Sequence, residues 1–430
     1  MLAFLVYGYL LIYYLRPAEW VPGLLGAPLQ LAAGILALGY LGLGACTGRF
    51  PHLKGGESEK MMWGLLLAIW MSHLSHFYFG GMLNSFSTFL PTITGFLLIV
   101  CYTDSRTRFN RMMTFLVLLT AFLAYQGWLQ ETTGVAAGGL GPIVERHAGP
   151  DGEPVVVSRV RWYGVFNDPN DLGLSLVAVL PYLFDLLLKR RFLLPLLTLP
   201  VICASIYFTN SRGTVLAGIV GLGSYFIFRY RSLKGAAIGA GLAVAIFLVG
   251  PSRMGSISAS EESAYGRIDA WYQAYLMFMS NPVFGVGQGM FTDYHPLTAH
   301  NSFVLVMAEL GFFGLFFFIG VFYFPYAWLL ANVMRRDTAV ADSDLGQVSA
   351  VFACLTGMLV AMFFISRSYV LVPYVLVALN IALIRILARE REGEGGRAFP
   401  PEAYRHGLAS IFKITVGHIV LIYLVVKVLL

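Results

Sequence analysis

The residues best suited to chemistry stand in a polar stretch that interrupts an otherwise apolar chain. Ala299-His300-Asn301 closes this stretch, which covers roughly residues 251–300. An imidazole, whose ordinary pKa lies near 6.5, can accept a proton at neutral pH, and general-base help of that kind contributes about 10²–10⁴ in rate. We therefore take His300 as the candidate base. The alternative is a polar side chain that hydrogen-bonds backbone at the entrance of a helix.

Three arginines occupy comparable outward places and suit an anionic ligand. Arg212 lies in residues 209–213, at a junction of two apolar runs, and Arg267 opens the amphipathic segment 266–280. Arg161 ends another long loop, beside two aromatic residues. A guanidinium binds phosphate oxygens in a fixed bidentate geometry. The alternative for Arg212 is an arginine that anchors a helix end by reaching into the membrane interface.

Other polar or aromatic residues stand beside these candidates and are expected to support them: Asn167, Asn170, Trp271, Asn301 and Glu309. Asn301 is also suited to capping the helix that follows it. Capping is the favoured role for Asp168 and Asn170, which flank Pro169 at the start of a helix. Glu309 falls inside an apolar run, where a lone carboxylate is costly, so we expect it to have a partner such as an arginine.

The segment around Arg267 has the pattern of a helix that lies in a membrane interface. Apolar and aromatic residues recur there at helical spacing, and Asn281-Pro282 ends the pattern; the recurring residues are Ile268, Trp271, Tyr272, Tyr275 and Met279. The glycine-rich turn Phe284–Gly289 follows, without the strand and acidic partner that a dinucleotide site requires. We expect this turn to let backbone approach a ligand or another helix closely.

The composition places these residues in a membrane protein. The 430 residues are 58% hydrophobic and only 12% charged, and the mean hydropathy is +0.72. That charge fraction is about half of what a soluble domain carries. Apolar runs of roughly 17–25 residues can cross a hydrocarbon core of about 30 Å as helices, and they lack the alternation of barrel strands. The predicted fold is therefore all-α and polytopic.

We predict about twelve membrane-spanning helices in a single integral membrane domain that covers residues 1–430. The expected spans are 1–15, 22–45, 61–80, 84–102, 112–130, 170–188, 193–209, 213–229, 235–250, 303–333, 346–365 and 369–387. The run 303–333 is too long for one straight crossing, so its start is expected to tilt or to lie at the interface. A thirteenth run, 409–430, is either a further span or an interfacial helix.

The basic residues orient these spans, because cytoplasmic loops are enriched in Lys and Arg. With the N-terminus inside, every inner loop is basic, through Arg49/Lys54/Lys60, Arg106/Arg108/Arg111, Lys189/Arg190/Arg191, Arg229/Arg231/Lys234, Arg335/Arg336 and Arg389/Arg391/Arg397/Arg405. Two long loops then face the periplasm, about 131–168 and 251–300, and we expect interfacial helices in them. The polar stretch 388–408 becomes a cytoplasmic linker.

The same observations exclude several classes of function. The formal charge of +6 comes mainly from the short basic clusters, so we expect membrane lipids and no nucleic acid among the partners. The sequence contains no P-loop motif that would bind ATP. The four cysteines lack the spacing of metal ligands. We expect neither a metal nor another cofactor.

Taken together, these pieces resemble the bacterial O-antigen ligase and polymerase superfamily. The resemblance covers roughly residues 160–320, and the order, spacing and outward location of its pieces make the combination specific. It rests on Gly164 to Asn170, Ser211-Arg212-Gly213, Gly266-Arg267 with Trp271, the turn Gly285-Val286-Gly287, and His300-Asn301 followed by Glu309-Leu310-Gly311.

The resemblance implies a glycan donor on undecaprenyl diphosphate at the periplasmic face of the bacterial inner membrane. A metal-independent, inverting glycosyltransferase would move this glycan to an acceptor hydroxyl on lipid A core, a growing glycan or a protein. Carried over residue by residue, Arg212 and Arg267 would hold the diphosphate and His300 would activate the acceptor. Arg161 is a looser match. Arginines that are already in place stabilise the charge that develops on a leaving diphosphate.

Two alternatives remain at this point. A polymerase of the same superfamily would use the same donor and transfer its glycan to another lipid-linked repeat. Paired Arg-x10-Gly patterns are typical of such polymerases; Arg212 to Gly223 fits one, and no clear second copy starts from Arg161 or Arg267, which favours a ligase. A flippase or transporter for the lipid-linked sugar would show internal repeats, and the sequence shows no convincing one.

Overall fold

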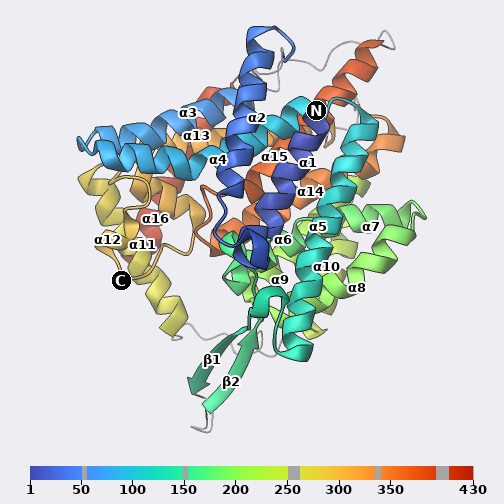
Figure 1. Ribbon diagram of the computed structural model, residues 1–430, viewed down its shortest axis with the longest axis horizontal. Helices are drawn as coiled ribbons and strands as arrows, with labels where there is room; N and C mark the ends of the chain where they lie inside the picture. The colour runs from blue at the N-terminus through green and yellow to red at the C-terminus, as the bar shows by residue number, and fades with distance from the viewer. Residues whose placement is uncertain (51–55, 149–153, 250–261, 335–339, 394–405, 430) are drawn as a thin grey trace. The chain divides into compact units, whose positions relative to one another are not determined.

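The structure, a computed structural model, describes residues 1–50, 56–148, 154–249, 262–334, 340–393 and 406–429 (Figure 1). Within these ranges the chain is almost entirely helical, which confirms the predicted all-α membrane fold. Its contacts divide it into two compact units. The first unit consists of residues 1–37, 105–256 and 341–361, and the second of residues 38–104, 257–340 and 362–430.

The first unit contains seven whole helices and one small sheet among its described residues. Its elements are α1 (Leu2–Leu15), α5 (Arg106–Thr133), β1 (Ile143–Ala148), β2 (Pro154–Arg159), α6 (Pro169–Val177), α7 (Leu180–Leu188), α8 (Leu193–Phe208), α9 (Arg212–Tyr230), α10 (Leu233–Val249) and most of α14 (Asp342–Phe364). Short 3-10 turns η1 (Pro17–Glu19), η2 (Pro22–Leu24), η4 (Ala137–Gly139) and η5 (Gly164–Phe166) connect them. Helix α2 (Leu29–Cys46) begins in this unit and ends in the second.

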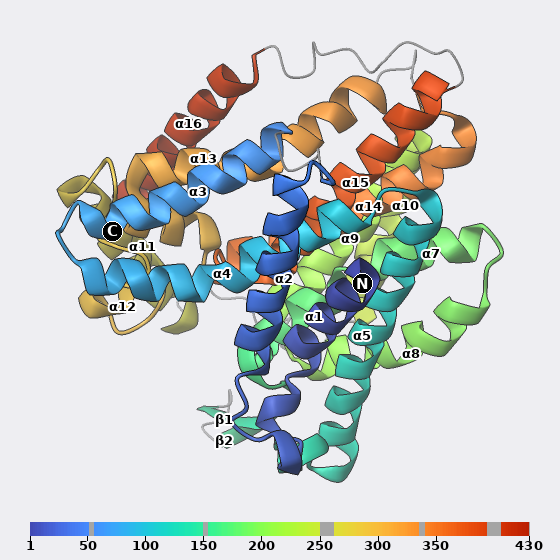
Figure 2. The same ribbon diagram turned by 45° about the horizontal axis from the view of Figure 1, so that its top comes forward.

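The second unit is built around a long helix with neighbours on several sides. Its elements are α3 (Glu57–Leu74), α4 (Phe79–Tyr102), α11 (Glu262–Ser280), α12 (Phe291–Tyr294), α13 (Ser302–Asn332), α15 (Leu371–Gly393) and α16 (Gly407–Leu429). Helix α13 packs against α3, α11, α15 and α16, and α3 runs beside it in Figure 2. The core of this unit therefore follows the predicted run 303–333.

Each of the thirteen apolar runs of the sequence contains a helix over most of its described residues. Among the described helices, nine are long and apolar enough to cross a membrane. These nine contain eight of the twelve predicted spans and the thirteenth run. The remaining four spans correspond to α1, α3, α8 and α10, and the predicted number of crossings stays a prediction.

The four other helices differ from the nine in length or in charge. Helices α1, α8 and α10 have 14, 16 and 17 residues, which at 1.5 Å per residue gives at most about 26 Å, less than the hydrocarbon core. Helix α3 has 18 residues, but its first turn carries Glu57, Glu59 and Lys60. Short helices of this kind fit a membrane when they tilt little or when the bilayer thins locally.

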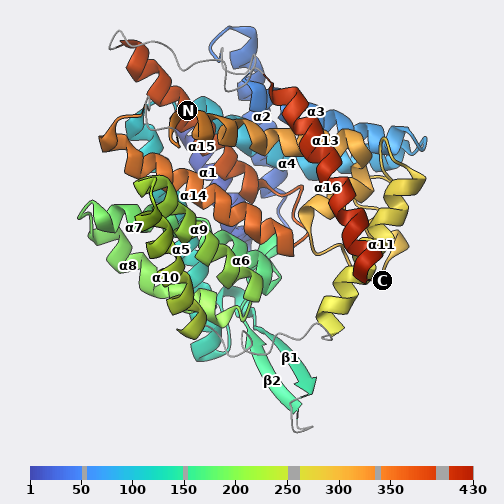
Figure 3. The same cartoon turned by 180° about the vertical axis from the view of Figure 1, so that it is seen from behind.

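The thirteenth run forms a helix that packs lengthwise along α13 (Figure 3). A Cβ on Gly407 would lie 2.7 Å from Phe324. Further along α16, the Phe412 ring lies 5.5 Å from that of Phe312, and the His418 ring lies 6.1 Å from that of Phe303. Residue numbers rise on one helix as they fall on the other, so the two are antiparallel. This packing favours a membrane-crossing helix over one that lies in the interface.

The glycine-rich turn approaches a helix, as expected, and it does so where that helix breaks. Helix α13 is interrupted at Gly311, whose φ of 63° and ψ of −160° are not helical. Gly285, with a φ of 72°, passes so close that an added Cβ would lie 2.2 Å from the carbonyl carbon of Glu309. Only residues without a Cβ can form this crossing. The break also explains how the 31 residues of α13 fit where one straight crossing does not.

The first long loop contains strands where an interfacial helix was expected. Strands β1 and β2 pair antiparallel, with Glu145 opposite Val157, and the hairpin projects past the end of α5 (Figure 1). The sequence carries a signal for it, because Gly149-Pro150-Asp151-Gly152 is a turn signature between two short β-prone runs. The second loop contains the amphipathic helix α11, which ends at Ser280 as predicted.

A first prediction concerns the glycines at the crossing. Gly285→Ala and Gly311→Ala should each lower the thermal midpoint of the detergent-purified protein strongly. In both cases the new Cβ meets backbone atoms at 2.2–2.6 Å, and it adds strain of about 1–2 kcal/mol at positive φ. Gly289→Ala is the control, because its φ is +81° but nothing lies within 4 Å of the new Cβ. Equal losses in all three variants would contradict the close crossing.

Candidate functional site

Helix α11 is held against the segment that leads to His300. The indole Nε1 of Trp271 donates to the carbonyl oxygen of Ala299 at 2.9 Å. Two residues before Trp271, the Asp269 carboxylate bonds to Nε2 of His295 at 3.1 Å. Arg267 precedes Trp271 by four residues and therefore lies on the same face of α11. The structure thus places Trp271 against the segment that ends at His300, and Arg267 lies about one turn earlier on the same helix.

His300 occupies a tight bend just before α13. Its φ is 46°, in the left-handed region that non-glycine residues rarely adopt. The residues on both sides are fully buried, with Ala299 and Asn301 each 0% exposed, whereas His300 is half-buried. The bend therefore separates the His300 side chain from two neighbours that are fixed in the core. Such a bend keeps the imidazole at a helix entrance, which both of its predicted roles require.

Asn301 caps α13, as its sequence context suggests. Its side-chain oxygen accepts the backbone N–H groups of Phe303 and Val304 at 2.9 and 3.2 Å. Ser302, which was not among the predicted site residues, adds a second anchor. Its hydroxyl donates to the carbonyl oxygen of Ile365 at 2.6 Å and accepts the N–H of Arg367 at 2.9 Å. The helix entrance beside His300 is therefore tied to the segment between α14 and α15.

The partners that the structure gives Glu309 are backbone N–H groups and the Tyr369 hydroxyl. The residue is 2% exposed, and its Oε1 accepts the N–H of Phe291 at 3.3 Å. The backbone of Gly289 contributes a second hydrogen bond to the carboxyl group. Glu309 therefore holds residues 289–291 against α13. The expected partner of this carboxylate is therefore present, but N–H groups of residues 289–291 supply it in place of a cation.

Arg212 is the first residue of α9 in the first unit. The preceding residue, Ser211, caps the helix and accepts the N–H of Thr214 at 3.2 Å. The same hydroxyl donates to Oδ1 of Asn170 at 2.6 Å. Asp168, and not Asn170, caps α6 by accepting the N–H of Asn170. The Asn170 side chain instead links the starts of α6 and α9, so it positions the backbone that carries Arg212.

A buried arginine that was not among the predicted site residues organises this region. Arg159 is 9% exposed and donates from Nη1 to the Glu145 carboxylate at 2.6 Å. Its Nε donates to the carbonyl oxygen of Thr209 at 3.0 Å, and its Nη2 to Oδ1 of Asn170 at 3.1 Å. The guanidinium therefore ties the hairpin to the junction before Arg212. The sequence analysis singled out the nearby Arg161, a looser match to the family, and the role of Arg161 in the site stays a prediction.

Arg161 contacts its own loop. Its Nε donates to the carbonyl oxygen of Gly141 at 3.1 Å, and its Nη1 to Oδ1 of Asn167 at 3.2 Å. The Gln130 side chain holds the Arg161 backbone through both its N–H and its carbonyl oxygen. Asn167 is therefore a partner of Arg161, and the pair stabilises the loop between β2 and α6.

An aromatic residue in this loop has a perturbed hydroxyl. Burial, and then the charge of Glu19, raises the pKa of Tyr163, although Arg161 opposes the shift. The hydroxyl stays protonated at neutral pH and donates to the carbonyl oxygen of Ala137 at 3.1 Å.

Within the described ranges no three His, Cys, Asp or Glu side chains gather as metal ligands would, and metal independence stays a prediction.

The structure therefore groups the predicted residues into two sets. The first unit carries Arg161 with Asn167, and Arg212 with Asn170. The second unit carries Arg267, Trp271, His300, Asn301 and Glu309. Convergence of Arg212 with Arg267 and His300 around one ligand stays a prediction.

Comparison with known proteins gives one family. Residues 196–319 match the family model described as O-antigen ligase, and this confirms the resemblance predicted from the sequence. The match supports a function of the O-antigen ligase or polymerase type in a multi-pass membrane protein. A search of curated proteins finds no match.

A second prediction concerns the buried arginine. Arg159→Gln should destabilise the first unit by about 1–3 kcal/mol, because hydrogen bonds to charged groups are lost and their partners remain half-buried. Limited proteolysis within residues 131–168 should become faster and the thermal midpoint should fall. Arg190→Gln, at an exposed arginine after α7, should change neither. Unchanged proteolysis in the Arg159 variant would show that the hairpin is held by other contacts.

Proposed function

We propose that this protein is a glycosyltransferase of the O-antigen ligase type. It transfers a glycan from undecaprenyl diphosphate to an acceptor hydroxyl, on lipid A core or a similar molecule, at the periplasmic face of the inner membrane. One observation carries the proposal: the region that matches the O-antigen ligase family, residues 196–319, encloses Arg212, Arg267 and His300. Fixed cations and a base are what such a transfer needs from a protein.

The proposed reaction assigns one role to each group. His300 removes the proton from the acceptor hydroxyl as its oxygen attacks the anomeric carbon of the glycan. The bond from that carbon to the diphosphate breaks, and its electron pair stays on a phosphate oxygen. Arg212 and Arg267 stabilise this charge, which lowers the barrier only if the guanidinium groups are already in place. Attack opposite to the leaving group inverts the anomeric configuration.

The local geometry supports these roles unequally. The hydrogen bond from Trp271 to Ala299 holds α11, the helix that carries Arg267, against the residue before His300. Arg212 starts a capped helix whose N-terminal N–H groups also attract phosphate. Arg161 is the looser candidate, because its Nε and Nη1 already bind Gly141 and Asn167. We retain it as a second contact to the diphosphate or its first sugar.

The break in α13 raises the question of a transporter, because broken helices mark many transport sites. In transporters the freed helix ends bind the substrate. Here the N–H groups of Phe312 and Phe313 donate to the carbonyl oxygens of Pro282 and Val283 at 2.8 and 3.0 Å. The break is filled by the protein's own backbone, which argues for a rigid scaffold and against a flippase.

A third prediction separates a ligase from a polymerase. The two activities share a donor and differ in the acceptor. In a bacterial strain that lacks this protein, a ligase function predicts accumulation of full-length glycan on the lipid carrier. Analysis of extracted lipid-linked glycans by mass spectrometry checks this outcome. Accumulation of single repeats would assign the polymerase function instead.

A fourth prediction tests the residues in purified protein with lipid-linked donor and acceptor. His300→Ala should lower transfer by about 10²–10⁴-fold, the usual contribution of a general base, while donor binding is retained. Arg212→Ala and Arg267→Ala should each weaken donor binding by about 10–100-fold, since hydrogen bonds to charged groups are worth about 1.5–3 kcal/mol. Lysine at either position should restore little, because it lacks the bidentate fork.

The controls are His406→Ala and Arg190→Gln, at exposed residues outside the proposed site. Both should behave as the wild type in transfer and in donor binding. Full activity of the His300 variant would remove this residue from the mechanism. Unchanged donor affinity in both arginine variants would remove the diphosphate role.

A further inference from the structure

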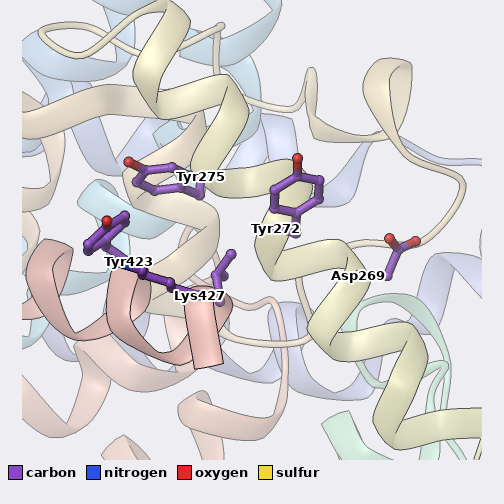
Figure 4. A pocket seen from close by; sticks show the side chains of 6 residues that line it. Asp269, Tyr272, Tyr275, Tyr423 and Lys427 are labelled. Carbon is purple, nitrogen blue, oxygen red and sulfur yellow. The ribbon is translucent and has the colours of Figure 1, made fainter. Parts of the chain in front are cut away.

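A cavity opens between α11, which belongs to the region that matches the family, and the C-terminal helix α16, which lies outside it (Figure 4). Its volume is about 490 Å³, within the ~300–1,000 Å³ of small-molecule sites. Its lining comes from two helices that are far apart in the sequence: Asp269, Tyr272 and Tyr275 from α11, and Tyr423, Val426 and Lys427 from α16. None of the residues from α16 belongs to the region that matches the family.

The lining is aromatic and polar, with a single aliphatic residue. Three of the six side chains are tyrosines, and the rings of Tyr275 and Tyr423 lie 5.6 Å apart. Tyr272 and Tyr423 are 40% and 39% exposed, so their rings and hydroxyls are accessible. A polyprenyl or acyl chain would be better accommodated by aliphatic side chains. Tyrosines instead offer flat apolar faces with hydrogen-bonding ends, which match the C–H faces and hydroxyls of sugar rings.

The two charged residues refine the class of ligand. Nζ of Lys427 lies 5.8 Å from the centre of the Tyr423 ring, and within the described ranges it has no carboxylate within ion-pair distance. A cation in this setting is available to an anionic substituent. Asp269 accepts from His295 through Oδ2, and a carboxylate oxygen has lone pairs for further donors such as sugar hydroxyls.

The cavity also has a defined relation to the proposed diphosphate contact, because both involve α11. Tyr275 follows Arg267 by eight residues, which is about 12 Å along the helix axis. A glycan whose diphosphate end lies near Arg267 would extend along α11 by about this distance within a few sugar units. The cavity is therefore within reach of the saccharide part of a substrate.

We infer that the cavity between α11 and α16 is a saccharide subsite that accepts a short sugar segment with an acidic substituent. The tyrosine rings pack against the sugar faces, Asp269 and the tyrosine hydroxyls bind sugar hydroxyls, and Lys427 binds a phosphate or carboxylate on the sugar. The inference rests on the proposed function for its substrate class. It extends that function by assigning α16 to glycan recognition.

The test uses the full-length protein in zwitterionic nanodiscs, without lipid-linked donor. The probes are a panel of neutral disaccharides and their 6′-phosphates, beginning with lactose and lactose 6′-phosphate, titrated by saturation-transfer NMR. The wild type should bind the phosphorylated members more tightly. Lys427→Gln should weaken their binding about tenfold, the effect of about 1.4 kcal/mol, and leave the neutral members unchanged. Tyr272→Leu should weaken both groups.

Matched variants show whether these effects are local. Lys413→Gln changes the same residue type on the same helix, and Tyr294→Leu changes an exposed tyrosine of α12; neither residue lines the cavity. Both variants should bind like the wild type. His300→Ala should also bind these probes normally, because no transfer takes place in the assay. Loss of transfer activity and loss of this subsite are therefore separate outcomes.

Three results would overturn the inference. The first is the absence of saturable binding of the panel to the wild type. The second is full competition by inorganic phosphate alone with no contribution from the sugar, which would indicate a plain anion contact. The third is loss of sugar binding in nanodiscs that contain phosphatidylglycerol, together with Lys427-dependent capture of that lipid, which would assign the cavity to a lipid headgroup.

Discussion

Backbone pairing between the glycine turn and the broken helix α13 is the constraint on which the second unit depends. A helix that stops inside an apolar layer exposes N–H and C=O groups, and each one is costly unless it finds a partner. Residues 282–287, which include the first part of the turn, supply these partners on both sides of Gly311. Val286 and Gly287 donate to the carbonyl oxygens of Ala308 and Glu309, while Phe312 and Phe313 donate to those of Pro282 and Val283.

This pairing determines where the candidate residues lie. It fixes the C-terminal end of α11, the helix that carries Arg267 near its start. It also fixes the first part of α13, which begins two residues after His300. The hydrogen bond from Trp271 to Ala299 and the Asn301 cap then hold the bend from both sides of His300. In the first unit a charged group serves the corresponding purpose, because Arg159 links the hairpin to the junction before Arg212.

Much of this arrangement could be predicted from the sequence, for identifiable physical reasons. Apolar length predicts helices, Asn281-Pro282 predicts the end of α11, and Asn301 and Asp168 act as the caps that their chemistry suggests. A close approach by the glycine turn was also predictable, since only glycine tolerates it. These features depend on local chemistry, which a sequence states directly.

The features that the sequence could not supply depend on tertiary partners. The break at Gly311 lies in a continuous apolar run, and nothing local marks it, because the groups that satisfy it lie in residues 282–287. Glu309 has backbone donors for the same reason. Which of Arg159 and Arg161 becomes buried depends on how the β1–β2 hairpin meets the α8–α9 junction, and no pattern within the residues themselves states that.

The crossing at Gly285 and Gly311 also has a consequence for how this protein enters the bilayer. The paired segments are close in sequence, with Val286 only 22 residues before Ala308, so closing the loop between them costs little chain entropy. The turn precedes α13 in the sequence, so its residues are synthesised before those of α13. The two parts of α13 can therefore lie at separate angles in the membrane while their backbone groups at the break stay paired.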